Sequence, residues 1–294
     1  MELYYNDVDI FNSVRIMRCE LDQYLSGHVD TLTVSFDDSR SEWGKWAPKH
    51  GDKLSVIEDY AKSGNMYINA LTPKNGVMTI RCAAITQIKS GHEQEWKDIK
   101  LKQLIDERAK GLGLTTEYFG VEDQKYNNVK QSGNDLAFLE EYCINEGCGF
   151  QVTDGILRCI AHDYLEKMET STYTLSAFDI RVTDLPYLSG CSITDGDKTG
   201  KAGDESGEVL TLKTERKFES ISEANRFAKN SLTYANLDRK SGEVYADKLI
   251  SEFAPGSKVM LNSDYWTDKP VIITHVRHDL YRGKSKLWFR LAKE

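Results

Sequence analysis

The chain has 294 residues and a mass of 33.4 kDa, enough for about two domains, and its 40% hydrophobic and 29% charged residues are typical of a folded protein. No segment approaches the roughly 18 consecutive apolar residues of a membrane-spanning helix, and the first residues lack the basic and apolar regions of a secretory signal, so we expect no membrane insertion and a cytoplasmic protein. The 38 basic and 46 acidic residues give a net charge of -8, which argues against stable nucleic-acid binding over a wide basic face.

The acidic excess is concentrated in the middle of the chain. Residues 1–90 carry 10 basic and 12 acidic groups, residues 91–166 carry 8 and 15, and residues 167–294 carry 20 and 19. Because charge balance often differs between domains, this asymmetry indicates that the middle third is a separate structural unit.

The first ninety residues have the pattern of short strands joined by turns. Residues 31–36 alternate strictly and place Leu32, Val34 and Phe36 on one face, and residues 77–85 form another candidate strand. Turn residues recur at short intervals between them, and no long helix fits this spacing. We therefore expect an all-β barrel or sandwich over residues 1–90.

Residues 91–170 change to a helical period and predict a small α+β unit. One helical face is formed by Leu101, Leu104, Ile105, Ala109 and Leu112, and Gly111 and Gly113 follow where a C-terminal cap is needed. A second helix is expected over 133–146, with Ser132 and Asp135 at the spacing of a capping box. The Asp154-Gly155 pair then predicts a hairpin turn between two strands.

Residues 171–294 return to strands and complete a β-rich α+β fold. One helix is expected behind Ser220 and Glu223, which again have capping-box spacing. The segment 194–208 is rich in Gly, Asp, Lys and Ser, so we expect an exposed and mobile loop there. The candidate strands are 175–182, 209–212, 258–261, 271–276 and 286–291.

The cysteines offer the nearest approach to a metal site. Cys143-x4-Cys148 and Cys159-x2-His162 could supply four zinc ligands, but the spacing is loose and His162 would point away from Cys159 on a strand. The alternative, which we favour, is that small apolar thiols fill a helix-on-hairpin core. Because the chain shows no export signal, all six cysteines are expected to be buried free thiols, and no metal or cofactor site is predicted.

Other reactive side chains do not form a convincing catalytic set. His275 and His278 would face opposite sides of a strand, and Asp279 next to them has no second cluster to complete a site. A glycosidase needs two carboxyl groups on either side of a sugar, and the adjacent carboxylates at 140–141 and 37–38 do not supply that separation. The sequence also contains no nucleophile elbow, P-loop or dinucleotide-binding motif. We predict that the chain is not an enzyme. Five tryptophans are candidates for either interface anchors or core residues: Trp43, Trp46, Trp96, Trp266 and Trp288.

Several short motifs follow one another in a characteristic order. In the first part of the chain, the strand at 31–36 precedes an acidic turn and then Pro48-x-x-Gly51-Asp52. The middle contains Asp135-x-x-Phe138-Leu139, Gly147-x-Gly149-Phe150 and Asp154-Gly155-x-Leu157. Near the end, Pro255-Gly256 precedes one candidate strand, and a second candidate strand follows at 273–278. In order and spacing these motifs resemble the late control D and baseplate hub family of contractile phage tails, tailocins and related injection systems.

The resemblance implies two similar β-barrel hub domains, at 1–90 and 171–294, that flank a small α+β domain at 91–170. It also implies a homotrimer whose six similar barrels form a pseudo-sixfold ring between a hexameric tail tube and a trimeric spike. The chain contains no needle-like repeat, so the implied spike is a separate protein; the tail tube protein and the tape measure protein are the other implied partners. The implied location is the host cytoplasm during assembly and then the baseplate of a phage tail or tailocin.

Two other functions are left open by the residues themselves. The aromatic content and the acidic middle are compatible with a β-rich module that binds cell-wall glycan or a receptor. The Cys/His residues and the His275 run would serve a metal-dependent hydrolase.

Overall fold

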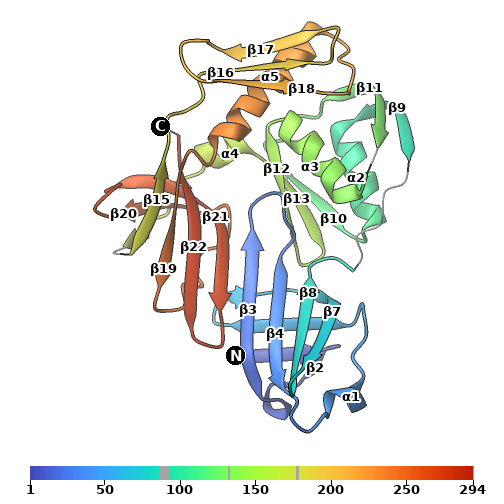
Figure 1. Ribbon diagram of the computed structural model, residues 1–294, viewed down its shortest axis with the longest axis vertical. Helices are drawn as coiled ribbons and strands as arrows, with labels where there is room; N and C mark the ends of the chain where they lie inside the picture. The colour runs from blue at the N-terminus through green and yellow to red at the C-terminus, as the bar shows by residue number, and fades with distance from the viewer. Residues whose placement is uncertain (87–92, 132, 177–178, 294) are drawn as a thin grey trace.

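One open sheet of 14 strands joins the two ends of the chain (Figure 1). The computed structural model describes residues 1–86, 93–131, 133–176 and 179–293. Along the sheet the order is β15 (Ile180–Asp184), β19 (Lys240–Ala246), β22 (Lys284–Leu291), β21 (Lys269–Asp279), β3 (Ile16–Tyr24), β4 (Thr31–Asp37), β8 (Val77–Ala83), β7 (Met66–Lys74), β5 (Lys53–Glu58), β1 (Glu2–Tyr5) and β2 (Val8–Asp9). Attached beside this path are β6 (Ala61–Lys62), β14 (Thr174–Ser176) and β20 (Lys258–Asn262).

The two halves of this sheet meet where β3 pairs with β21. The pairing is antiparallel and places His275 opposite Tyr24 and Asp279 opposite Glu20. The expected pair of β-barrels is therefore not confirmed: strands from both ends of the chain share one sheet, and its path does not close on itself in the described part of the chain. The fold is β-rich, with few helices and several sheets.

The predicted strands agree with the observed ones at most positions. The segments near 31, 77, 209, 258, 271 and 286 lie in β4, β8, β18 (Val209–Lys213), β20, β21 and β22. The segment 175–182 is an exception, because β14 ends at Ser176 and β15 begins at Ile180, while residues 177–178 lie outside the described residues. The first ninety residues contain only short helices in their described part, α1 (Trp43–Trp46) and the 3-10 helix η1 (Phe11–Ser13).

The middle of the chain forms two small sheets packed with helices. The predicted face of the first helix is confirmed, since Leu101, Leu104 and Ile105 are fully buried. The predicted hairpin is also confirmed: Asp154 and Gly155 both have the positive φ of a type I′ turn. The elements are β9 (Gln94–Lys100) paired with β11 (Lys125–Gln131); β10 (Thr115–Phe119), β13 (Ile156–Ala161) and β12 (Cys148–Thr153) in a three-stranded sheet; and α2 (Leu101–Gly111), α3 (Asp135–Asn145) and α4 (His162–Lys167).

The cap of α3 differs from the prediction. Asn134 is the N-cap, and its side-chain oxygen accepts the N–H of Ala137 at 2.8 Å. Ser132, the predicted cap, lies outside the described residues. An asparagine one residue before the helix satisfies the same free N–H groups, so it supplies the signal that was assigned to Ser132.

The segment 194–208, expected to be an exposed loop, is exposed at most of its residues but contains a strand that the sequence analysis did not predict. β17 (Thr199–Gly203) crosses this segment and forms a three-stranded sheet with β16 (Gly190–Thr194) and β18, against which α5 (Ile221–Asn236) packs (Figure 1). Helix and strand approach so closely at Gly200 that a Cβ there would lie 2.0 Å from the carbonyl oxygen of Ala224. Because close packing here requires small residues, the strand lacks the large apolar residues by which strands are recognised.

Buried apolar side chains form two main clusters. The larger spans the N-terminal strands, the middle of the chain, β16 and α5, and the smaller lies within the C-terminal strands around Val259, Val271 and Phe289. Residues 190–236 thus share a core with the middle of the chain, although they lie between strands of the C-terminal half. Among the described residues, no helix combines the length and apolar character needed to cross a bilayer.

Candidate functional site

Three of the four proposed zinc ligands lie together. The sulfur of Cys159 is 3.7 Å from that of Cys143 and 3.4 Å from that of Cys148, and all three side chains are at most 1% exposed. His162 does not belong to this group of ligand atoms. The three thiols fill the space between α3 and the β12–β13 hairpin as small apolar side chains would.

The His275 run is divided between the two faces of β21, as its strand position predicts. His278 is 1% exposed, and its Nδ1 lies 2.9 Å from Oγ of Ser285. Burial lowers the pKa of His278 to about 4. His275 lies on the opposite face, where its Nε2 is 2.8 Å from the carboxylate of Asp22. The run therefore brings no two imidazoles together.

A row of five side chains crosses five strands on the His275 face. Its members are paired in register from β3 through β21, β22 and β19 to β15: Tyr24, His275, Trp288, Glu243 and Arg181. The His275 ring stacks 4.3 Å from Tyr24 and 3.9 Å from Trp288, measured between ring centroids. Glu243 pairs with Arg181 at 3.5 Å and with Lys286 at 2.7 Å. Cross-strand contacts of this kind fix strand register, so the row stabilises the junction of the two sheet halves.

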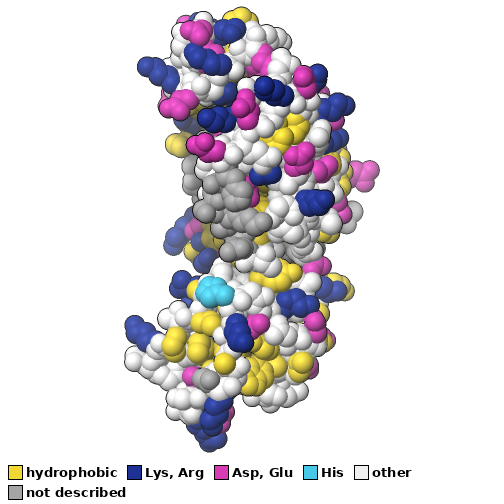
Figure 2. Space-filling model, turned by 90° about the vertical axis from the view of Figure 1, so that its right-hand side faces the viewer, with side chains coloured by type: hydrophobic (Ala, Val, Ile, Leu, Met, Phe, Trp, Pro, Cys, Tyr) yellow, Lys and Arg dark blue, Asp and Glu magenta, His cyan; other side chains and the backbone are white. Residues whose placement is uncertain are grey.

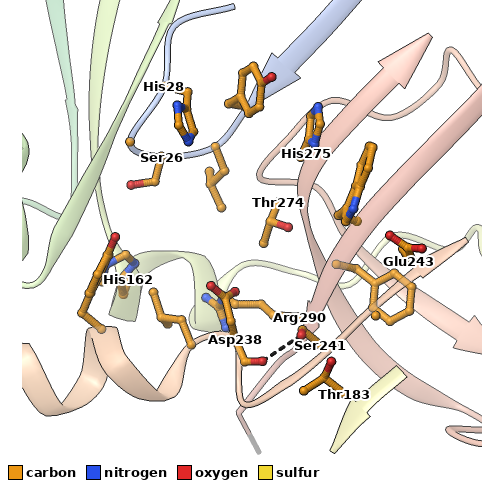
Figure 3. Close-up of a pocket in the computed structure, with 18 of the residues that line it drawn as sticks. Ser26, His28, His162, Thr183, Asp238, Ser241, Glu243, Thr274, His275 and Arg290 are labelled. Carbon is orange, nitrogen blue, oxygen red and sulfur yellow. Dashed lines mark hydrogen bonds between the residues drawn. The ribbon is translucent and has the colours of Figure 1, made fainter. Parts of the chain in front are cut away.

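This row forms the floor of a cleft of about 650 Å³ at the junction of three parts of the chain (Figure 3). The walls come from the β3–β4 loop at 25–28, from Glu140 of α3 and His162 of α4, and from the end of α5 with Tyr234, Leu237 and Asp238. Arg290 of β22 and Thr274 of β21 also line the cleft. The cleft is therefore built from residues that are distant in sequence.

Two buried side chains in the cleft have unpartnered polar atoms. Arg290 is 2% exposed, and its NH1 contacts Glu166 at 2.5 Å, whereas its NH2 has no hydrogen-bond partner in the described part of the chain. His162 is 4% exposed, and its Nε2 likewise has no partner among the described residues. Burial and the charge of Arg290 lower the pKa of His162 to about 4, so the imidazole is neutral at pH 7. Buried polar groups are normally hydrogen-bonded, which makes these two atoms unusual.

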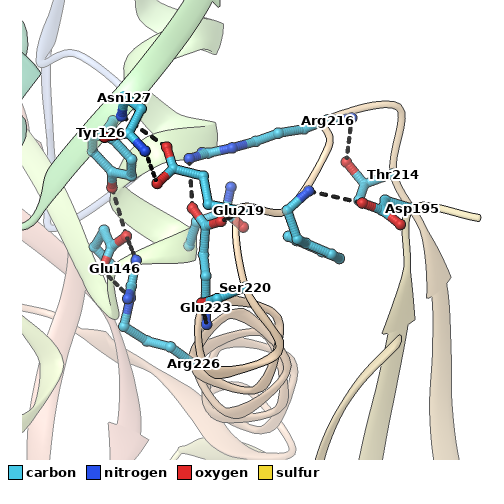
Figure 4. A network of polar contacts seen from close by, with 12 residues as sticks. Tyr126, Asn127, Glu146, Asp195, Thr214, Arg216, Glu219, Ser220, Glu223 and Arg226 are labelled. Carbon is cyan, nitrogen blue, oxygen red and sulfur yellow. Dashed lines mark hydrogen bonds and ion pairs between the residues drawn. The ribbon is translucent and has the colours of Figure 1, made fainter. Parts of the chain in front are cut away.

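A polar network attaches α5 to the middle of the chain (Figure 4). The carboxylate of Glu146 accepts hydrogen bonds from Arg226 at 2.9 and 3.0 Å and from the hydroxyl of Tyr126 at 2.5 Å. Arg216 pairs with Glu223 at 3.0 Å and lies within 4.8 Å of the ring centroids of Tyr126, Tyr142 and Phe227. The network is mostly buried, so it holds the unit of residues 190–236 firmly on the middle of the chain.

The tryptophans divide between core and surface. Trp43, Trp96 and Trp266 are 5 to 8% exposed, and Trp288 belongs to the cross-strand row. Trp46 is 46% exposed and stacks on Tyr5, with 5.2 Å between ring centroids. Figure 2 shows hydrophobic side chains gathered at the end of the molecule that holds the N-terminal strands, while charges of both signs cover the opposite end. Of the five, Trp46 thus has the exposure of an interface anchor.

Sequence reasoning missed the cleft. It considered His162 as a candidate zinc ligand and Glu140 as half of a carboxylate pair but favoured neither role, and it did not single out Tyr234, Asp238 or Arg290. The one local signal is Arg290 itself, a charged residue on a strand whose neighbours Leu287 and Phe289 are buried.

Comparison with known proteins identifies the fold. No family model and no curated protein matches the sequence. The structure is similar over almost its whole length to the 43 kDa tail protein of prophage MuSo2 from Shewanella oneidensis, with a TM-score of 0.75, 10% identity and coverage of 98% of this chain and 97% of that one. For the tail protein of Neisseria meningitidis MC58 the TM-score is 0.76, the identity is 11% and the coverage is 100% and 96%. A component of the Escherichia coli type VI secretion system gives a TM-score of 0.63 at 11% identity, with coverage of 100% and 78%. The chain therefore has the fold of these phage tail proteins, in agreement with the family that its sequence resembles.

Proposed function

We propose that this chain is a structural hub subunit of a phage-tail or tailocin baseplate. Three copies form a ring that joins the hexameric tail tube to a trimeric spike, and the two β-rich ends of each chain supply six similar positions around the axis. A threefold ring of chains with two similar halves can contact both a sixfold and a threefold partner.

The observation that carries this proposal is the likeness in fold over almost the full length of two tail proteins. Coverage is 97% and 96% of those chains, so the likeness extends beyond a common small domain. The arrangement of the sheet agrees with the proposal: β3 and β21 bring the two β-rich ends side by side, on either side of one seam.

In this proposal the chain acts through its contacts and not through catalysis. Its partners are two further copies of itself, the tail tube protein, a separate spike protein and the tape measure protein. Assembly takes place in the host cytoplasm, and the final location is the baseplate. The contacts that hold such a ring are expected to be large and to use exposed aromatic anchors such as Trp46, which is 46% exposed.

Light scattering on the chain co-expressed with the tube and spike proteins of its own particle tests the proposal. Three chains of 33.4 kDa predict a hub of about 100 kDa within the purified complex. A complex that contains a single copy of the chain, or a chain that stays monomeric at high concentration beside both partners, would overturn it.

A further inference from the structure

The cleft at the junction of the three parts of the chain is lined by two residues with unused hydrogen-bonding groups. Arg290 and His162 are 2% and 4% exposed, and NH2 of the first and Nε2 of the second are buried without a hydrogen-bond partner among the described residues. Leaving such groups unpaired in a folded protein is unfavourable. A guanidinium can only donate, so a group that pairs with Arg290 in the cleft must offer an acceptor such as a carbonyl oxygen.

The cleft also contains two carboxylates and an aromatic ring, and the Tyr234 ring lies 6.4 Å from that of His162 between centroids. The side-chain carboxylates of Glu140 of α3 and Asp238, just after α5, form no hydrogen bond or ion pair with a described residue, although the main-chain oxygen of Asp238 accepts a hydrogen bond from the Ser241 hydroxyl at 2.8 Å. Tyr234 lines the cleft with them and is 38% exposed. Burial raises the pKa of Tyr234, and the negative charges of Glu140 and Asp238 raise it further. Two carboxylates beside an aromatic ring form a suitable site for an ammonium or guanidinium group.

The remaining charges of the cleft are already paired. Glu243 contacts Lys286 at 2.7 Å and Arg181 at 3.5 Å, and Arg290 contacts Glu166 at 2.5 Å. The charge left without a partner is therefore negative, which disfavours phosphate, nucleic acid or an acidic segment as the occupant.

We propose that this cleft binds an extended segment of a partner protein, with a lysine or arginine side chain between Glu140 and Asp238 and main-chain carbonyl oxygens at Arg290 and His162. A peptide is the occupant that supplies both a cation and neutral oxygen acceptors within a short length of chain. The cleft, with a floor of five strands and walls from three separate parts of the chain, is rigid enough to hold such a segment in one register (Figure 3). The inference rests on the proposed function only in that the chain assembles with another protein.

Short capped peptides test the proposal on the full chain. The probes are acetyl-Gly-Lys-Gly-amide, its arginine analogue, and the matched glutamine and glutamate peptides. The chain is labelled with fluorotyrosine, and the 19F resonance of Tyr234 is assigned from the Tyr234→Phe variant. We expect the lysine and arginine peptides to shift this resonance saturably with millimolar dissociation constants, and the other two peptides to leave it unchanged.

The variants separate the cleft from general surface charge. The double variant Glu140→Gln and Asp238→Asn should weaken the lysine peptide by about tenfold, because both partners of the cation lose their charge. The matched control Glu141→Gln removes one charge from the next residue of α3, which does not line the cleft, and should leave binding unchanged. His162→Gln keeps a donor and should bind more weakly without loss of the preference for a cation.

Equal shifts with all four peptides, no saturable shift up to about 20 mM, or unchanged binding by the double variant would overturn the proposal. These outcomes are independent of oligomeric state. A chain that assembles into a trimeric hub but fails to bind the lysine peptide refutes the cleft proposal alone, whereas a chain that binds this peptide but never forms the trimer refutes the proposed function alone.

Discussion

Replacing Asp30 by asparagine should stabilise the protein, and more so at high pH. Asp30 is fully buried immediately before β4; its Oδ1 accepts the N–H of Tyr24 at 3.0 Å, and its Oδ2 has no partner among the described residues. Burial raises the pKa of Asp30 to about 7, even though hydrogen bonds from Tyr24, Thr153 and Gln23 favour the charged form. An ionised Asp30 is therefore unfavourable in the folded state.

The sign and size of the effect follow from this raised pKa. In the unfolded chain Asp30 ionises with a pKa near 3.8, so the folded state binds its proton more tightly. The stability that this group contributes is present below pH 3.8 and is lost as the pH rises through 7. A shift from 3.8 to about 7 corresponds to about 4 kcal/mol at full ionisation. Asparagine resembles the protonated form, so Asp30→Asn should gain about 2.5 kcal/mol more stability at pH 8 than at pH 5.

Urea unfolding of the wild-type protein and the Asp30→Asn variant at pH 5 and pH 8, followed by tryptophan fluorescence, measures the gain in stability at each pH. The contributions of the other titrating groups cancel because both proteins contain them. Asp22→Asn is the matched control. Burial raises the pKa of Asp22, but hydrogen bonds from His275 and Arg277 outweigh it and leave the pKa below its ordinary value. Asp22→Asn should therefore destabilise the protein at both pH values. A gain for Asp30→Asn that is the same at pH 5 and pH 8, or a loss at pH 8, would refute the reasoning.

Three further predictions concern buried groups. Burial lowers the pKa of His278 from 6.5 to about 4, so the neutral imidazole contributes stability above pH 6.5 that is lost as the pH falls to 4. Urea unfolding of the wild-type protein should show a loss of about 3 kcal/mol in the free energy of unfolding over this range, and the His278→Asn variant should not show it. The same dependence of stability on pH in the variant would contradict this prediction. Gly200→Ala should lower the free energy of unfolding by about 2 to 3 kcal/mol, because the added Cβ would meet the backbone of Ala224. The control Gly207→Ala, whose Cβ would have no neighbour closer than 3.5 Å, should change the free energy of unfolding by less than about 0.5 kcal/mol. Equal effects of the two substitutions would exclude the close approach of β17 and α5 at Gly200. All six cysteines are buried, and burial raises the pKa of Cys19 and Cys82 to about 12. A thiol reagent should therefore label no cysteine in the folded protein and all six in denaturant. Rapid labelling of the folded protein would contradict this prediction.

The sequence predicts elements whose signals are local. Ser220 and Glu223 mark the start of α5 because the cap is formed by neighbouring residues: the Ser220 hydroxyl accepts the N–H of Glu223 at 3.1 Å. The alternation of Leu32, Val34 and Phe36 likewise marks β4, since all three side chains are fully buried on one face. Such elements need no knowledge of the rest of the chain.

Other features depend on contacts that no local pattern contains. β17 is recognisable only once α5 is known to pack on Gly200, and β3 pairs with β21 across 253 residues between Asp22 and His275. The cleft brings together Arg290 and His162 from separate parts of the fold, so the sequence could name His162 as a reactive residue but not its surroundings. Long-range pairing, and not helix or strand propensity, decided these cases.

Cryo-electron microscopy of the assembled particle tests the central claim most directly. We expect three copies of this chain around the tail axis, between the last ring of the tube and the spike, with the two β-rich ends of each copy alternating around the ring. Six copies in that ring, or a position in the sheath or the fibres away from the axis, would contradict the account.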